Sequence, residues 1–195
     1  MTILSFPELM KRRRLLQGDE TIGRDIDAAL AEFLDARISP GSVTLETGAG
    51  LSTLVILRTQ PRRHTAVHPS AEAFAAILEF AVRQGIDTRG FLPVLARSQD
   101  WLPGAELPEL DLVLVGGAPF PVPLIDWYFA AERLKAGGLM VVEGTQQATG
   151  TMLADFMQAD PGWEPVARSG ASQFASYRKR SPSVSDPERQ PGNER

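Results

Sequence analysis

The residues best suited to chemistry lie in the stretch LETGAG. Glu46 lies two positions before Gly48, and Gly50 follows two positions later, between an apolar run and an amphipathic segment. Closely spaced glycines let a ligand approach the backbone, and the amides that begin a helix attract anions. A neighbouring carboxylate suits a positive group on the same ligand. We therefore expect this stretch to bind a small molecule that carries both charges.

Two common ligands of a glycine-rich turn are disfavoured. The dinucleotide fingerprint G-x-G-x-x-G needs a third glycine where this chain has Thr53, and Glu46 would repel a pyrophosphate. A phosphate-binding P-loop needs a lysine after the turn, and none follows it directly. S-adenosylmethionine carries an ammonium and a sulfonium beside a carboxylate, so it suits both Glu46 and the glycine amides. The residues favour this cofactor.

The elements around this stretch alternate between extended and helical patterns. The expected strands are 43–46, 65–67, 91–96, 111–115, 139–142, 163–168 and 173–178, and the expected helices begin near 51, 70, 124 and 151. This alternation predicts an α/β fold with a doubly wound, mostly parallel seven-stranded sheet and helices on both faces. Ligands of such sheets bind at the carboxyl ends of the strands, commonly after the first strand. The stretch ETGAG lies at that position.

Three local signals refine this expectation. Pro93 cannot donate to a ladder, so its strand should lie at the edge of the sheet. The helix from 124 should end at Gly137 and Gly138, with a basic last turn that includes Lys135. The last two strands should form an antiparallel hairpin around Gly170.

The chain divides into three regions. Residues 1–40 show helical periodicity and should form an N-terminal helical cap. Residues 41–179 hold the alternating elements and should form one domain, because 195 residues are too few for two comfortable ones. Residues 180–195, where Val184 is the one aliphatic side chain, should be a disordered tail.

The composition narrows the class of partner. Apolar residues make up 43% of the chain and the net charge is −4, so no basic field attracts a nucleic acid or an anionic membrane. The absence of cysteine excludes disulfides and thiolate chemistry and fits a reducing compartment. No apolar run approaches the roughly 18 residues of a membrane span. We expect a cytoplasmic protein that acts on small molecules; a homodimer is compatible with the sequence.

Two stretches resemble one family. LETGAGLST resembles motif I of the class I S-adenosylmethionine-dependent methyltransferases, and DLVLVGGAPFPVPLIDWYFAAERLKAGGLMVVEGTQ resembles their fourth strand, next helix and fifth strand. The second stretch is most similar to a largely uncharacterised bacterial branch, whose Asp-Trp pair is kept here as Asp126 and Trp127. The resemblance implies a Rossmann-like methyltransferase domain over 41–179 with strand order 3-2-1-4-5-7-6. That order places the third strand at an edge, in agreement with Pro93.

The resemblance also implies a set of cofactor-binding residues. Motif I should hold the methionine part, and His68 takes the place of a carboxylate that usually binds the ribose. Asp100 and Trp101 lie where the family often contacts the adenine. The implied residues are Glu46, Thr47, Gly48, Gly50, Ser52, His68, Asp100, Trp101 and Gly116.

Several departures from the family pattern keep an alternative open. The fourth strand ends in Gly116 where relatives have aspartate, and Gly144 follows Glu143 where many have a second acid. Metal-dependent, catechol-type members of the family hold magnesium with carboxylate or amide oxygens at both strand ends, and only Glu143 remains here, so the resemblance implies no metal. No catalytic base is assigned, although His68 and Glu143 are candidates by position and His64, which precedes the second expected strand, is a weaker candidate. The expected activity is methyl transfer to a small-molecule acceptor, bound between the N-terminal helices and the loops 118–122 and 145–150. The alternative is a degenerate, non-catalytic relative that binds a nucleoside ligand or a protein partner.

Overall fold

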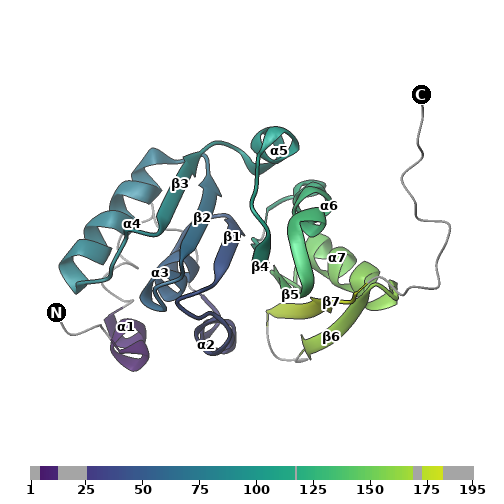
Figure 1. Cartoon of the computed structure of the whole chain (residues 1–195), viewed down its shortest axis with the longest axis horizontal. Coiled ribbons are helices and arrows are strands. Elements are labelled where there is room, and N and C mark those ends of the chain that lie inside the picture. Colours follow the sequence, from purple (N-terminus) through teal and green to yellow (C-terminus); the bar gives the residue numbers. More distant parts are fainter. Residues whose placement is uncertain (1–4, 13–25, 117, 169–172, 182–195) are drawn as a thin grey trace.

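The protein is a seven-stranded sheet between two layers of helices (Figure 1). The computed structural model describes residues 5–12, 26–116, 118–168 and 173–181. The predicted turn at Gly170, part of the helical cap and nearly all of the predicted tail lie outside these residues. No helix within the described ranges is long and apolar enough to cross a membrane.

The sheet has the predicted strand order. The strands are β1 (Val43–Thr47), β2 (Arg63–His68), β3 (Phe91–Leu95), β4 (Leu110–Val115), β5 (Leu134–Glu143), β6 (Trp163–Arg168) and β7 (Phe174–Lys179). Their order is β3-β2-β1-β4-β5-β7-β6, with β1 to β5 parallel and the closing β6–β7 pair antiparallel. The edge position of β3, inferred from Pro93, is confirmed. The α/β, doubly wound fold class is confirmed with it.

Helices connect the strands and cover both faces of the sheet. They are α1 (Phe6–Arg12), α2 (Ala28–Arg37), α3 (Leu51–Arg58), α4 (Ala71–Gln84), α5 (Ser98–Trp101), the 3-10 turn η3 (Leu102–Gly104), α6 (Val122–Arg133) and α7 (Ala148–Ala159). Helix α4 begins where expected, because the Ser70 hydroxyl accepts a hydrogen bond from the Ala73 amide at 3.1 Å. It ends at Gly85, which adopts φ +68.

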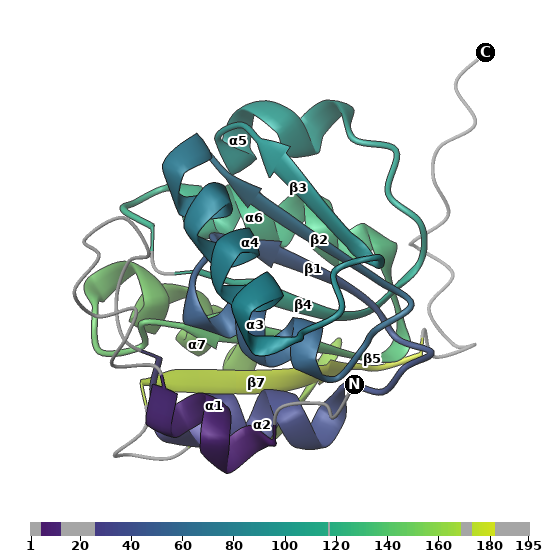
Figure 2. The ribbon, with the colours of Figure 1, turned by 90° about the vertical axis from the view of Figure 1, so that its left-hand side faces the viewer.

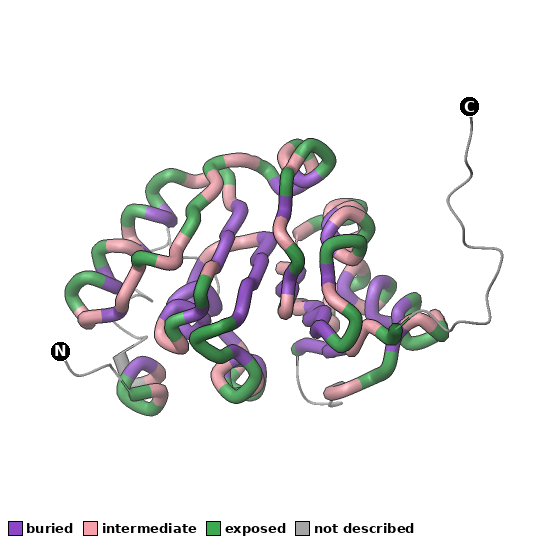
Figure 3. Tube along the Cα trace, in the orientation of Figure 1, coloured by how far each residue is buried: buried purple, intermediate pink, exposed green. Residues whose placement is uncertain are grey.

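Two apolar layers hold the helices to the sheet. Leu112 and Leu114 of β4 pack with α1 to α4, whereas Val113 and Val115 pack with α6 and α7. This division follows from the alternation of side chains along a strand. Figure 2 shows α3 and α4 on the near side of the sheet, and Figure 3 shows that the central strands are its most buried part.

Strand β5 differs from the prediction. The preceding helix ends at Arg133, and Gly137 and Gly138 lie inside the strand rather than at the end of the helix. The pairing with β4 shifts there, from Leu110 opposite Leu134 to Leu112 opposite Leu139, and Gly137 has φ +81. Two glycines therefore form an irregularity that a bulkier pair would resist. Lys135 consequently lies in β5, where its ammonium binds Asp111 at 2.9 Å.

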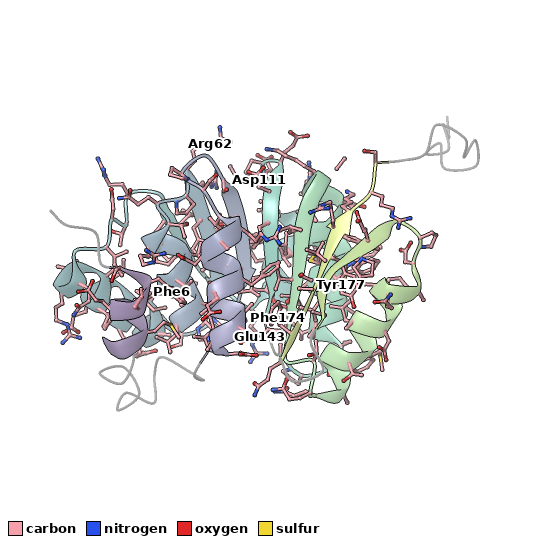
Figure 4. All side chains as sticks on the ribbon, turned by 90° about the horizontal axis from the view of Figure 1, so that it is seen from below. Phe6, Arg62, Asp111, Glu143, Phe174 and Tyr177 are labelled. Atoms are coloured by element: carbon pink, nitrogen blue, oxygen red, sulfur yellow. The ribbon has the colours of Figure 1, made fainter. Side chains whose placement is uncertain are left out.

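The two ends of the sheet differ in their surroundings. Asp111 lies near Arg62 at the end where β4 begins, and its carboxylate accepts a 2.8 Å hydrogen bond from the Val43 amide. Glu143 lies at the opposite end, where β5 finishes opposite Phe174 of β7 (Figure 4). The carboxyl ends of the parallel strands thus gather at the Glu143 end, where a ligand site is expected.

Candidate functional site

A cavity of about 580 Å³ lies at the carboxyl ends of the parallel strands. It opens where the strand order reverses, between β1 and its neighbours β2 and β4. Its size falls within the range typical of small-molecule sites. Seven of the nine predicted cofactor-binding residues line it, namely Glu46, Thr47, Gly48, Gly50, Ser52, His68 and Gly116.

The turn between β1 and α3 forms one wall of the cavity. Gly48 adopts φ +127 and donates a 2.9 Å hydrogen bond to the Val67 carbonyl. A Cβ built on Gly48 meets no atom within 4 Å, so the space above it is open to a ligand. The Gly50 amide donates to the Thr53 hydroxyl at 3.0 Å, and α3 begins at the next residue. The wall therefore offers close backbone approach and the N-terminus of an eight-residue helix.

The Glu46 carboxylate is buried beneath this turn, with an exposed fraction of 2%. Its Oε1 accepts a hydrogen bond from the Ser52 hydroxyl, and its Oε2 accepts one from the Thr53 hydroxyl at 2.7 Å. His64 Nε2 lies 3.2 Å from Oε2. An ionised carboxylate has about four acceptor positions, so a ligand donor can still join these protein donors. Glu46 thus holds α3 and β2 together in addition to facing the cavity.

His64 is a part of this network that the sequence did not reveal. It is fully buried on β2, it stacks on Phe91 at 5.8 Å between ring centroids, and its Nδ1 lies 2.9 Å from the Thr44 hydroxyl. A carboxylate only accepts, so Nε2 carries the proton toward Glu46. The only signal that could have found this contact is the register that places His64 beside Thr44 on the neighbouring strand.

His68 lies where β2 ends and lines the cavity. Its Nδ1 accepts a 3.1 Å hydrogen bond from the Ser70 amide, and its ring meets the edge of Phe74. In the neutral ring this bond leaves the proton on Nε2. His68 can therefore donate a hydrogen bond, whereas the carboxylate it replaces could only accept one.

Asp100 and Trp101 do not line the cavity. Both lie on α5, where Asp100 is exposed and Trp101 packs against the apolar layer around α6. The residues of this segment that do line the cavity are Arg97, Ser98 and Gln99. The segment that the family resemblance singled out therefore reaches the cavity through these neighbours, and the adenine contacts of Asp100 and Trp101 stay predictions.

Asp126 of α6 is a buried carboxylate in the cavity wall. It is 1% exposed, and both of its oxygens lack a hydrogen-bond partner within the described part of the chain. Burial raises the pKa of the Asp126 carboxyl, and the nearby hydroxyls of Ser98 and Thr47 offset only part of that shift. A buried acid of this kind is characteristic of functional sites. The sequence marked Asp126 only as half of the Asp-Trp pair.

The burial of Asp126 predicts a pH-dependent cost to folding. An acid whose folded-state pKa is raised binds more protons in the folded state, so stability falls as pH rises from the unfolded pKa of about 3.9 through the folded value. We expect Asp126→Asn to raise the free energy of unfolding at pH 7 by about 1 kcal/mol, with a difference that shrinks toward zero near pH 4. Urea denaturation across this pH range measures it. Asp100→Asn, at an exposed site, is the control, and equal pH slopes for wild type and Asp126→Asn would contradict the prediction.

The opposite wall comes from the segment after β5. Glu143, Gly144, Gln146 and Gln147 line it, and Gly144 has φ +73. Gly150 of α7 lies against the Gly144 carbonyl so closely that a Cβ there would overlap it. Helix α7 therefore fixes the position of this wall. Within the described ranges no group of three or more His, Asp or Glu side chains is arranged to hold a metal ion.

Comparison with known proteins places this site in a common architecture. No protein-family model matches the sequence, and no curated protein matches it significantly. Among solved structures, cofactor-bound Rv0187 from MTB is 18% identical with a TM-score of 0.73, covering 88% of this chain and 89% of that chain. The O-methyltransferase TomG from Streptomyces achromogenes, in complex with SAM, is 14% identical with a TM-score of 0.69. The match covers 90% of this chain and 89% of that chain. SMU.1697c from Streptococcus mutans, described as a methyltransferase in complex with SAH, is 13% identical with a TM-score of 0.60. The match covers 80% of this chain and 99% of that chain.

These likenesses concern the fold. Together with the strand order, they show that the chain has the Rossmann-like fold of S-adenosylmethionine-dependent methyltransferases. At this level of identity, the activity of this chain has to be argued from its own site.

Proposed function

We propose that the protein transfers the methyl group of S-adenosylmethionine to a small-molecule acceptor. The observation that carries this proposal is the composition of one cavity, in which an open glycine turn and a helix N-terminus lie beside the buried carboxylate of Glu46. A ligand that bears a carboxylate and a cation suits both the helix N-terminus and the Glu46 carboxylate. The shared fold, including that of structures with SAM or SAH bound, supports the same cofactor.

The residues around the cavity suit the parts of this cofactor. Gly48, Gly50 and Ser52 would receive the amino-acid carboxylate through backbone amides at the start of α3, with the Glu46 carboxylate and Thr47 beside the ammonium. His68 would donate its Nε2 proton to a ribose oxygen. Gly116 would meet the nucleoside through its backbone at the end of β4, where the Thr47 carbonyl occupies the place of a side chain.

The chemistry asked of the protein is mainly alignment. When bound, S-adenosylmethionine supplies an electrophilic methyl group on a positively charged sulfur, which leaves as a neutral thioether. The chain's residues must hold an acceptor atom in line with that methyl and keep water away. The walls that can do so are formed by Ala118 and Pro119 before α6, by Val122 at its start, and by Gln146 and Gln147 after β5. Apolar and amide side chains of this kind suit a small neutral acceptor better than a polyanion.

Isothermal titration calorimetry with S-adenosylmethionine and S-adenosylhomocysteine tests the proposal. We expect micromolar binding by the wild type and none by Gly48→Arg, whose side chain would occupy the open space above the turn. Because φ at Gly48 is strained for any other residue, circular dichroism must show that the variant is folded. Gly41→Arg, where a Cβ also meets nothing within 4 Å, is the matched control. A folded wild type that binds neither ligand would refute the proposal and favour a non-catalytic relative.

A further inference from the structure

The buried network beneath the glycine turn includes a histidine that lies behind the cavity wall. His64 of β2 is fully buried and is not among the described residues that line the cavity. A buried polar ring costs more free energy than an apolar side chain of similar size unless its nitrogens find partners. Here Nδ1 lies 2.9 Å from the Thr44 hydroxyl, and Nε2 lies 3.2 Å from Oε2 of Glu46. These contacts point to a role of His64 in the network, beyond packing.

The two contacts fix where the ring of His64 carries its proton. The Glu46 carboxylate only accepts, so Nε2–H donates to it. In the neutral ring Nδ1 is then an acceptor, and the Thr44 hydroxyl donates to it. Thr44 lies opposite His64 in the strand register, and Glu46 follows two residues later on the same face of β1. The three side chains therefore form one directed chain of hydrogen bonds.

The donors to Glu46 are distributed unequally over its two oxygens. The Ser52 hydroxyl donates to Oε1, whereas the Thr53 hydroxyl and His64 Nε2–H both donate to Oε2. A carboxylate oxygen accepts at about two positions, so these donors fill Oε2 and leave one position on Oε1. Ser52 and Thr53 belong to α3, whereas His64 ties the carboxylate to β2. The arrangement thus leaves a single place at which a ligand donor can meet Glu46.

We infer that His64 is a positioning residue, which directs the ligand's ammonium to Oε1 of Glu46 by occupying the second position on Oε2. This inference rests on the proposed function, in which Glu46 meets the ammonium of the cofactor. Without His64, Oε2 has an open acceptor position in a buried place, which is costly, so the carboxylate turns from its fixed orientation. The ammonium then loses a charge-assisted contact whose geometry was set in advance. Thr44 acts one step further out, by keeping the proton of His64 on Nε2.

Calorimetry with two ligands tests this inference. The ligands are S-adenosylhomocysteine and its analogue in which hydrogen replaces the α-amino group. We expect the wild type to bind S-adenosylhomocysteine about tenfold more tightly than the analogue. In His64→Phe, which keeps a ring against Phe91, this ratio should fall by about threefold or more, while the affinity for the analogue stays nearly constant. His64→Gln places an amide donor near the position of Nε2 and should restore most of the ratio.

Two further variants test the chain of hydrogen bonds. Thr44→Val removes the hydroxyl that meets Nδ1, so the ring can carry its proton on either nitrogen, and the ratio should be intermediate. Thr65→Val is the matched control, because Thr65 is the next residue of β2, is also buried and points to the other face of the sheet. It should keep the wild-type ratio. Circular dichroism verifies that each variant is folded, and Thr44→Val decides if His64→Phe does not fold.

The outcomes separate this inference from the proposed function. Equal weakening of both ligands in His64→Phe overturns the inference, because a purely structural role affects both alike. An unchanged ratio in the deciding variant, or an equal fall in Thr65→Val, also overturns it. A wild type that binds both ligands equally well overturns the inference and leaves cofactor binding standing. If the folded wild type binds neither ligand, the proposed function itself fails, and the inference fails with it.

Discussion

Glu46→Gln is expected to weaken S-adenosylhomocysteine binding by about 1 to 3 kcal/mol, or roughly 5- to 150-fold. The change removes the negative charge that faces the ligand's ammonium. It also replaces one carboxylate oxygen, which accepts hydrogen bonds, with an amide nitrogen, which donates them. The neighbouring Ser52 and Thr53 hydroxyls are themselves donors to this side chain. The Thr53 hydroxyl already accepts from the Gly50 amide and must donate to Glu46, so the amide nitrogen is forced toward Ser52. We also expect the free energy of unfolding to fall, separately from the loss of affinity, by about 1 to 3 kcal/mol.

Two measurements separate the roles of Glu46. Calorimetry gives the loss of affinity, and urea denaturation gives the loss of stability. Glu79→Gln is the matched control, because its side chain is 67% exposed on α4 and pairs only with Arg83 among the ion pairs described. Lower stability with unchanged affinity would show that Glu46 only holds α3 and β2 in place and does not meet the ligand.

Much of the fold could be predicted from local sequence patterns, because each of these patterns has a physical cause within the same element. Alternating periods marked the strands and helices, and Pro93 marked the edge strand through its missing donor. The glycines at 137 and 138 show the limit of this reasoning. A glycine pair ends a helix or permits a strand irregularity equally well, and the pairing of β4 with β5 decides between them.

The candidate site was predictable in part for a similar reason. Glu46 and the glycines lie in one continuous stretch, so their shared wall could be predicted from the sequence. His64 meets Glu46 only because β1 and β2 pair in a particular register. Asp126 becomes a buried, unpartnered acid only through the packing of α6 near Ser98 and Thr47. Contacts set by register and packing between elements leave no mark in a local pattern.

Gly116→Ala is expected to have the largest effect on stability. A Cβ at this position would overlap the carbonyl oxygen of Thr47, which also accepts a 2.9 Å hydrogen bond from the Gly116 amide. The atoms nearest to this Cβ are backbone atoms of Thr47 and Gly48, so the overlap is relieved only if the ends of β1 and β4 separate. We expect the free energy of unfolding to fall by about 3 kcal/mol and ligand affinity to fall at least about tenfold, because both strand ends form the cavity wall.

Gly41→Ala is the matched control, since its Cβ meets nothing within 4 Å and its stability should change by about 0.5 kcal/mol or less.

The overlap at Gly116 also bears on why β4 ends in glycine, where relatives of the resembled family have aspartate. A side chain does not fit at Gly116 on this backbone, so Gly116→Asp should also destabilise the protein rather than strengthen ligand binding. Urea denaturation of the three variants measures the first effect, and calorimetry with S-adenosylhomocysteine measures the second. A stable Gly116→Asp variant with higher affinity would show that the strand ends can open, and that the glycine is a lost acid rather than a steric requirement.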